Sequence, residues 1–530
     1  MHNNNRNTSF VRQAAILGLA SLFVRLIGFA YRIPLTHRLG DAGMGFYNIA
    51  YYVYAFVIVI TSGALPASVS RLVSERLAKK QYRNAHELFK TAMFYGIFIG
   101  VFVGIVMWFG ADWFAMLFNS PESAYGIRAL APAVFIVAML AVFRGYFQGM
   151  KTTMPTAVSQ VVEQIFNVVF TVWLAFLFFD AARLQYSVAG GAAGTGIGAL
   201  AAVGVIGFVY FLVSDKLKER VNSDMGHGLF ESRGSQLKII LRCSLPIIVG
   251  MGVYSAATLI DFAMASDRLE ASGVWTDDEI NIFIGQFSNK FILLTTLPVS
   301  LSVALSAAVL PDITTSQVEM DINAIRAKTN MALRVSMIMS LPAAVGLSVL
   351  ADPILHLLFP AFPDGGWLLT FGGVSIIFLA MVQIFTGVLQ GIGRVGIPLI
   401  GAIFGTLAKI PVNYFLVVIP EINILGVVIS TIVCYVVASI INLYFLWKFT
   451  GIMPDFRGAL LKPLIASGAM GLVAFLSYNL AAWVAPGQVA TIFALFVSVL
   501  AYFAFMVLIR GLSEGDLRAL PVPGWIRRII

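Results

Sequence analysis

The sequence has little charge and almost no cysteine or histidine. Of its 530 residues, 12% are charged, two are cysteines and five are histidines. Cys243 and Cys434 lie in apolar stretches, so a disulfide framework is excluded and we interpret both as buried small hydrophobic residues. The histidines are never spaced as ligand pairs, so neither a metal site nor a cofactor is expected. Because no Walker-type motif is present, ATP hydrolysis by the chain itself is not expected either.

Apolar residues dominate instead. They make up 59% of the chain, more than the surface of a water-soluble domain of this size tolerates. Runs of about 20 apolar residues are typical of membrane-spanning helices, and the segments between them leave no room for a soluble catalytic domain. We therefore predict an all-α integral membrane protein with 14 transmembrane helices, at about 10–36, 46–70, 88–111, 126–149, 155–179, 187–214, 237–262, 280–309, 330–351, 366–389, 395–419, 422–447, 460–484 and 487–510.

The basic residues indicate the direction of these spans. If the N-terminus lies inside, the inner segments hold 26 of the 35 lysines and arginines and the outer loops hold four. This bias is the positive-inside pattern of membrane proteins, so both termini are expected in the cytoplasm. The excess of positive charge then reports topology, and no nucleic-acid partner is expected. The first span carries arginines and lacks a small-residue cleavage site, so we expect it to be retained.

Two short motifs occur twice in the chain. FRGYFQG (143–149) and FTGVLQG (385–391) share Phe-x-Gly-x-x-Gln-Gly, and LPASVS (65–70) and LPVSLS (297–302) share Leu-Pro-x-Ser-x-Ser. Their sequence offsets, 242 and 232, are similar, as expected of one duplication followed by a small insertion. We predict two parallel six-helix lobes, an architecture suited to alternating access, and an appended C-terminal helix pair. The predicted domains are residues 1–236, 237–452 and 453–530.

Charged residues inside the spans are the candidate site. A charge in hydrocarbon is costly, so it is expected to face a cavity or a charged partner. Cations outnumber anions there, and a cationic cavity favours an anionic ligand such as a diphosphate. The cations are Arg25, Arg32, Arg144, Lys290 and Lys409, and the anions are Glu163 and Asp261.

Several of these charges have a second interpretation. Arg32 and Arg144 lie near opposite ends of their spans, so each side chain can instead reach the membrane surface. Arg144 can also pair with Glu163, which would make Glu163 a structural or coupling partner and not a ligand. Asp261, at a helix end, is the other candidate for coupling.

Uncharged polar residues extend the candidate site. Gln160, Glu163, Gln164, Asn167 and Thr171 recur at helical spacing and share one helix face, which we expect to line water. The remaining predicted cavity-lining residues are Gln286, Asn289, Gln383, Gln390 and Asn413.

Three stretches resemble a known superfamily. FRGYFQGMKTTMPTAVSQVVEQ (143–164), RLIGFAYR (25–32) and SGALPASVSRLVSE (62–75) resemble the multidrug, oligosaccharidyl-lipid and polysaccharide exporter superfamily, in the branch of the MurJ and stage V sporulation protein B flippases of Gram-positive bacteria. The resemblance covers essentially the whole chain. It implies a monomer with an inverted-V fold that moves the undecaprenyl-diphosphate-linked peptidoglycan precursor lipid II to the outer leaflet of the bacterial cell membrane, with cell-wall synthesis proteins as partners.

The match is incomplete at two motifs. Gram-negative lipid II flippases look like Arg-x-x-Gly-x-x-Arg-Asp in the first helix, and here Arg25 and Gly28 fit this pattern. Tyr31 and Arg32, however, take the places of its second arginine and its aspartate. The eighth-helix pattern Ala-Asp-Arg-Leu is replaced by Ser-Asn-Lys-Phe at 288–291, and lysine lacks the bidentate fork that arginine offers a phosphate.

Other functions stay open at this point. A teichoic-acid, capsule or spore-cortex intermediate would suit the same fold as cargo. A drug or cation antiporter would favour an acidic cavity, and the excess of cations within the spans argues against it. A polyprenyl-linked glycosyltransferase would need carboxylates on an outer loop, where the acidic residues at 277–279 are explained by a solvated loop face.

Overall fold

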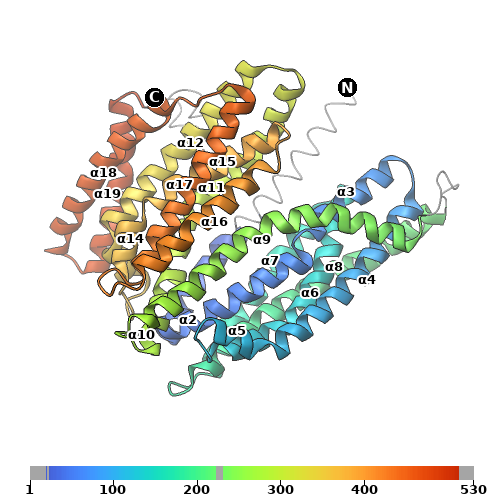
Figure 1. Cartoon of the computed structure of the whole chain (residues 1–530), viewed down its shortest axis with the longest axis horizontal. Coiled ribbons are helices and arrows are strands. Elements are labelled where there is room, and N and C mark those ends of the chain that lie inside the picture. Colours follow the sequence, from blue (N-terminus) through green and yellow to red (C-terminus); the bar gives the residue numbers. More distant parts are fainter. Residues whose placement is uncertain (1–19, 21–22, 223–230, 512–530) are drawn as a thin grey trace. The chain divides into compact units, whose positions relative to one another are not determined.

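The structure is a computed structural model that describes residues 20, 23–222 and 231–511. Within these residues the regular elements are all helices (Figure 1). Twelve of them are long and apolar enough to cross a membrane, or 13 if the bent pair α14 and α15 forms one span. The prediction of an all-α, multi-pass membrane protein is therefore confirmed. The first predicted span, 10–36, lies largely outside the described residues, so the count of 14 stays a prediction.

Contacts divide the chain into two compact units, Met1–Ala263 and Met264–Ile530. Because this division falls within a helix, the predicted domain boundaries at 236 and 452 stay predictions. Unit 1 contains α2 (Arg32–Ile58), η1 (Val59–Gly63), α3 (Leu65–Ala78), α4 (Tyr82–Phe109), α5 (Ala111–Leu117), α6 (Ser123–Gly149), α7 (Met154–Leu177), α8 (Leu184–Asn222) and most of α9 (Arg233–Ala271). Unit 2 contains α10 (Asp277–Gly285), η2 (Gln286–Ile292), α11 (Leu293–Val318), α12 (Ile322–Val349), α13 (Ala351–Leu358), α14 (Gly366–Gly372), α15 (Ser375–Gly391), α16 (Ile397–Leu416), α17 (Leu425–Thr450), η3 (Arg457–Leu461), α18 (Lys462–Ala482) and α19 (Gly487–Leu508).

The two units contain the same order of helices. α4 and α12 both have 28 residues, and each is followed by a short helix, α5 in unit 1 and α13 in unit 2. The helices α4, α5, α7 and α8 begin at positions 82, 111, 154 and 184, and their counterparts α12, α13, α16 and α17 begin at positions 322, 351, 397 and 425. The interval between counterparts is nearly constant from α4 to α8, as the predicted duplication requires.

The Phe-x-Gly-x-x-Gln-Gly motif makes the same packing contact in each unit. A Cβ added to Gly149 or to Gly391 would lie 2.8 or 2.7 Å from a side chain of the neighbouring helix. The Ser74 hydroxyl donates to the carbonyl of Gly149 at 2.7 Å, and the Thr314 hydroxyl donates to that of Gly391 at 3.1 Å. Glycine is needed at both places because the helices approach each other too closely for a side chain.

The Leu-Pro-x-Ser-x-Ser copies, by contrast, are not in equivalent packing positions. Residues of positive φ enclose the span concerned: Gly40 and Lys80 in unit 1, and Gly273 and Met320 in unit 2. Counted between these residues, the unit 2 span is about two helical turns longer than the unit 1 span. An insertion of two whole turns leaves the same face of the helix in contact with its neighbours. It also makes the sequence offset before the insertion smaller than the offset after it.

A sharp turn divides α2 into two helices. Gly40 has φ 68° and ψ −179°, a conformation that glycine adopts far more readily than other residues. In a straight helix Arg32 and Asn48 would be about 24 Å apart, yet their side chains are hydrogen-bonded at 2.9 Å. The chain therefore reverses at Gly40, between the first and second predicted spans.

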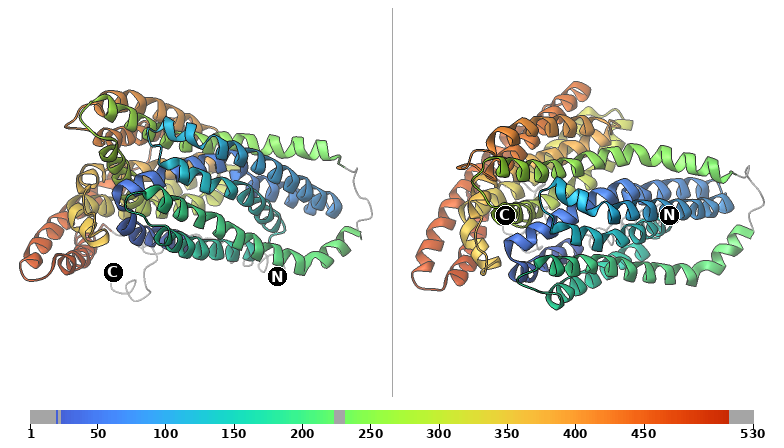
Figure 2. Two further views of the ribbon diagram at one scale, coloured as in Figure 1. Left: turned by 90° about the horizontal axis from the view of Figure 1, so that it is seen from below. Right: turned by 60° about the horizontal axis from the view of Figure 1, so that its bottom comes forward.

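The last two helices, α18 and α19, lie side by side (Figure 2). They pack on α12 of unit 2 through an apolar cluster that includes Ile338, Met470 and Met506. Close van der Waals packing of these side chains holds the pair against the unit, because lipid tails are as apolar as the side chains themselves.

Candidate functional site

A buried arginine lies among tyrosines where α2 turns back on itself. Arg32 is 8% exposed, and its Nη1 donates to Oδ1 of Asn48 at 2.9 Å. The guanidinium lies 5.8 Å from the ring centroid of Tyr51, within the range of a cation–π interaction. The hydroxyls of Tyr31 and Tyr47 lie 3.4 Å apart. The side chain is therefore buried in unit 1 and bonded to the second half of α2.

Arg144 on α6 and Glu163 on α7 form an ion pair. Nη2 of Arg144 donates to Oε2 of Glu163 at 2.6 Å, and its Nε donates to the Ser159 hydroxyl at 3.0 Å. The two charged side chains are 15% and 26% exposed. Since water screens them only in part, this pair interacts more strongly than a surface pair would. The sequence left two alternatives for Arg144, and the structure shows the pair.

The helices that carry this ion pair adjoin the helix that carries the tyrosines. Both α6 and α7 pack against α2 in unit 1. The Tyr51 ring is stacked near that of Tyr47, with 6.3 Å between centroids. α2, α6 and α7 thus build one polar and aromatic assembly in unit 1. We call it the unit 1 cluster, and it comprises Arg32, Asn48, Tyr47, Tyr51, Tyr54, Arg144 and Glu163.

The tyrosines of this cluster were not predicted from the sequence. Their signal is the run YNIAYYVYAF at 47–56, in which Tyr47, Tyr51 and Tyr54 recur at helical spacing. On hydropathy alone this run is simply part of an apolar span. Tyrosine combines an apolar ring with a polar hydroxyl, so it does not stand out on a hydropathy scale.

The polar face of α7 is divided between two environments. Gln160, Glu163, Gln164 and Asn167 are half-buried, but Thr171 is fully buried. The Thr171 hydroxyl donates to Oδ1 of Asn167 at 2.9 Å. A Cβ added to Gly194 of α8 would come within 3 Å of Thr171, so this glycine lets the helices touch. The expectation that the whole face lines water is therefore wrong at Thr171.

Arg25 and Asp261 lie in contrasting environments in unit 1. Arg25 is exposed, whereas Asp261 on α9 is 4% exposed. Arg25 and Arg32 are two helical turns apart on one face, but only Arg32 is covered by the second half of α2. Whether Arg25 binds an anion and whether Asp261 couples to transport stay predictions.

Lys290 lies fully buried in the π-helical turn η2 of unit 2. It is 0% exposed, and its ammonium donates to the carbonyls of Phe362 at 2.8 Å and Asp364 at 2.6 Å. These carbonyls belong to the segment between α13 and α14, so the lysine ties that segment to η2. The structure gives Lys290 a structural contact, and its predicted contact with a diphosphate stays a prediction.

The other predicted residues of unit 2 are buried or half-buried. Lys409 on α16 is 3% exposed and Asn413, one turn further on, is 0% exposed. Gln286 and Asn289 are buried, and the α15 residues Gln383 and Gln390 are half-buried. A shared chamber for Lys409, Lys290 and the arginines of unit 1 stays a prediction, as does the inverted V.

The comparisons with known proteins decide the family. The family described as "Polysaccharide biosynthesis protein" matches residues 10–317, more than half of the chain. The chain belongs to this family. A stage V sporulation protein B of Bacillus subtilis is 21% identical over 97% of this chain and 98% of its own length. The lipid II flippase MurJ of the same organism is 23% identical over 84% of each chain.

A solved structure shows that the fold is shared as well. A lipid II flippase MurJ in an inward closed conformation superimposes with a TM-score of 0.68 at 16% identity, over 94% of this chain and 99% of its own. The predicted membership of the exporter superfamily, in the MurJ and stage V sporulation protein B branch, is confirmed. Proteins of this family with a named activity in these comparisons are flippases or transporters and not enzymes.

Proposed function

We propose that this protein is a flippase for a lipid-linked cell-wall sugar precursor. The cargo that fits best is the undecaprenyl-diphosphate-linked precursor lipid II, whose head group, the diphosphate with its sugar, would move from the inner to the outer leaflet by alternating access. The family and the named activity of MurJ support this class of cargo. A second candidate is a lipid-linked intermediate of the spore cortex, favoured by the similarity to stage V sporulation protein B along nearly its whole length.

The observation that carries the proposal is the ion pair between Arg144 and Glu163. Two arginines, Arg32 and Arg144, lie within the spans of unit 1, where an uncompensated charge would be costly. Each is compensated by the protein, Arg144 by a carboxylate at 2.6 Å and Arg32 by an amide oxygen at 2.9 Å. A phosphate offers arginine the same geometry as a carboxylate.

The pair therefore suggests how an anionic head group is exchanged. In the empty protein, Glu163 would hold the position on Arg144 that a phosphate oxygen takes in the loaded protein. Departure of the cargo then leaves no bare cation inside the membrane, so the empty site can return. Tyr47 and Tyr54 are buried, but Tyr51 is half-buried, and its hydroxyl and ring face suit the sugar attached to the diphosphate.

The membrane potential favours this direction of transport. With the cytoplasm negative, outward movement of a negative charge releases roughly 2.3 kcal/mol per 100 mV. The polyprenyl tail stays in lipid throughout, so only the head group needs the shelter of the protein.

The acidic residues at 277–279 give no support to a glycosyltransferase. They form the first turn of α10, and Thr276 and Glu279 build a capping box there. Glu279 accepts hydrogen bonds from the Thr276 backbone N–H and hydroxyl, both at 2.9 Å. Negative side chains stabilise the start of a helix, so this cluster has a structural explanation.

Depletion of the protein tests the proposal. In cells without another lipid II flippase, lipid II labelled from outside should fall several-fold while total lipid II accumulates. Arg144→Ala and Arg32→Ala, expressed at the level of the unaltered protein, should fail to restore labelling. Unchanged labelling after depletion would remove lipid II as the cargo, and a change in another lipid-linked sugar would support the second candidate.

A further inference from the structure

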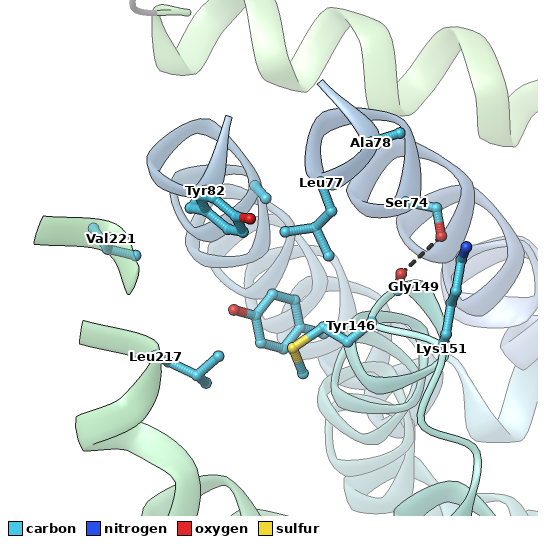
Figure 3. A pocket seen from close by; sticks show the side chains of 11 residues that line it. Ser74, Leu77, Ala78, Tyr82, Tyr146, Gly149, Lys151, Leu217 and Val221 are labelled. Carbon is cyan, nitrogen blue, oxygen red and sulfur yellow. Dashed lines mark hydrogen bonds between the residues drawn. The ribbon is translucent and has the colours of Figure 1, made fainter. Parts of the chain in front are cut away.

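A cavity of about 270 Å³ lies at the end of unit 1 where α3, α6 and α8 end and α4 begins. It is separate from the unit 1 cluster. Apolar side chains make up most of its wall, among them Leu77, Met150 and Leu217, and two tyrosines, Tyr82 and Tyr146, complete it (Figure 3). Among the described residues of the lining, Lys151 provides the one ammonium group.

The fold does not require this cavity, because the corresponding place in unit 2 is filled. Ala85, in the cavity wall, is the fourth residue of α4, and Ile325 is the fourth residue of the equivalent helix α12. Ile325 packs in a core cluster with Ile452 and Ala459. In unit 2 the chain turns at Gly451 (φ 67°) directly after α17 and covers α12. In unit 1, α8 has 39 residues against 26 for α17, so it continues past this point and forms a wall.

Two lysines in the turns beside the cavity have an unusual backbone conformation. Lys80 lies between the lining residues Ala78 and Tyr82, and Lys151 is the second residue after the end of α6. Their φ angles are 60° and 61°, in the left-handed region that non-glycine residues rarely adopt. In unit 2 the second residue after the end of α15 is Gly393, with φ 81°.

This comparison suggests that the Lys151 ammonium group has a use. A residue held in a strained conformation is a starting point for a functional hypothesis, and at the position equivalent to Lys151 unit 2 uses glycine. The position equivalent to Lys80 is Met320, with φ 58°. Lys80 and Lys151 are both exposed. Among the ion pairs of the described residues, neighbouring Lys79 pairs with Glu75 at 2.8 Å and Lys218 with Asp215 at 3.0 Å, and none involves Lys80 or Lys151.

We propose that this cavity binds an anionic phospholipid, with the phosphate between Lys80 and Lys151 and the start of an acyl chain against Leu77, Met150 and Leu217. The apolar wall suits a hydrocarbon chain, and the two ammonium groups suit a phosphate. The positive-inside pattern predicts that this end of unit 1 faces the cytoplasm, where anionic lipids attract basic groups of membrane proteins. The proposal does not depend on which cargo the protein moves.

Native mass spectrometry of the purified full chain in detergent tests this site. Dioctanoylphosphatidylglycerol is titrated against dioctanoylphosphatidylcholine, which has no net charge, and against inorganic phosphate. We expect one phosphatidylglycerol to bind at least about tenfold more tightly than either. Lys151→Gly and Lys80→Gly should each weaken it about fivefold, the worth of one cation near an anionic surface.

The variants separate binding from folding. Glycine relieves the left-handed strain, so Lys151→Gly and Lys80→Gly should melt no lower than the unaltered protein.

Lys90→Ala is the control for lipid binding, because Lys90 lies on α4, is 53% exposed and pairs with Glu87. This variant should bind the lipid as before. Leu217→Trp should reduce lipid binding by filling the apolar wall. Equal binding of both lipids, or unchanged binding by Lys151→Gly, would overturn the proposal, and binding of phosphate as tight as that of the lipid would overturn the acyl-chain part.

Discussion

The Thr91 hydroxyl on α4 donates a 2.7 Å hydrogen bond to the side-chain oxygen of Gln236 on α9, and both side chains are buried. Further along the same contact the hydroxyl of Ser244 donates to that of Ser68 at 3.0 Å. Water that enters the gap can satisfy these polar groups in turn, so the contact opens without leaving them unpaired. The first half of α9 is therefore suited to part from α3 and α4 during a transport cycle.

A disulfide across this contact tests that idea. In a chain with Cys243→Ala and Cys434→Ala, Ser68→Cys and Ser244→Cys should oxidise readily, because their oxygens are only 3.0 Å apart. We expect the oxidised protein to transport at least about tenfold more slowly, since the cross-link prevents α9 from separating from α3. Reduction should restore the rate.

A second pair of serines provides the control. The hydroxyls of Ser302 and Ser336 lie 2.7 Å apart between α11 and α12 of unit 2. Cysteines at these two positions should also form a disulfide, with little effect on the rate. Full transport by the oxidised 68–244 pair would show that α9 does not need to leave α3.

The pair of Arg144 and Glu163 should be measurable as a coupling energy. A double-mutant cycle with Arg144→Gln and Glu163→Gln, followed by unfolding in detergent, should give about 1 kcal/mol of mutual stabilisation. Each single variant leaves one charge without its partner, so the double variant should be more stable than their sum predicts. It should still fail to transport, because the proposed phosphate contact is gone. Transport by the double variant at the normal rate would contradict the role given to Arg144.

We expect Lys290 to contribute mainly to the stability of the fold and not directly to transport. Lys290→Met leaves the carbonyls of Phe362 and Asp364 without their donor, and we expect a loss of about 3 kcal/mol in unfolding free energy. Lys448→Met is the control, because Lys448 is exposed on α17 and should change stability by less than about 0.5 kcal/mol. If Lys290→Met instead melts normally and still fails to transport, the lysine acts on the cargo.

Gly40 should be the least replaceable glycine of α2. Its φ of 68° strains any other residue, so Gly40→Ala should lower the unfolding free energy by about 1–3 kcal/mol. Gly204 on α8 is the matched control, since a Cβ added there meets no atom within 4 Å. Gly204→Ala should be neutral or slightly stabilising, because alanine favours a helix more than glycine does. Melting temperatures of the two variants provide the comparison.

Particular residues show which features of the structure could be predicted from the sequence and which could not. The repeated Phe-x-Gly-x-x-Gln-Gly motif predicted the duplication, because close packing of two helices requires glycine at fixed spacing. The Leu-Pro-x-Ser-x-Ser motif predicted an insertion but not its place, since a helix lengthened by two whole turns presents the same face. Arg144 was predicted to face a ligand cavity, with Glu163 and the membrane surface as alternatives, because helical spacing gives directions within one span and not distances between spans.

By itself the sequence determined that this chain crosses the membrane many times, that it is built from two copies of one helical unit, and that cations lie within its spans. Those properties follow from local composition and periodicity, which a chain carries before it folds. Only the tertiary structure decided that Lys290 is bound by two carbonyls, that tyrosines of α2 surround Arg32, and that unit 1 leaves open a cavity that unit 2 fills. Contacts between residues far apart in the chain depend on where the helices turn and how closely they pack, and neither composition nor spacing specifies these.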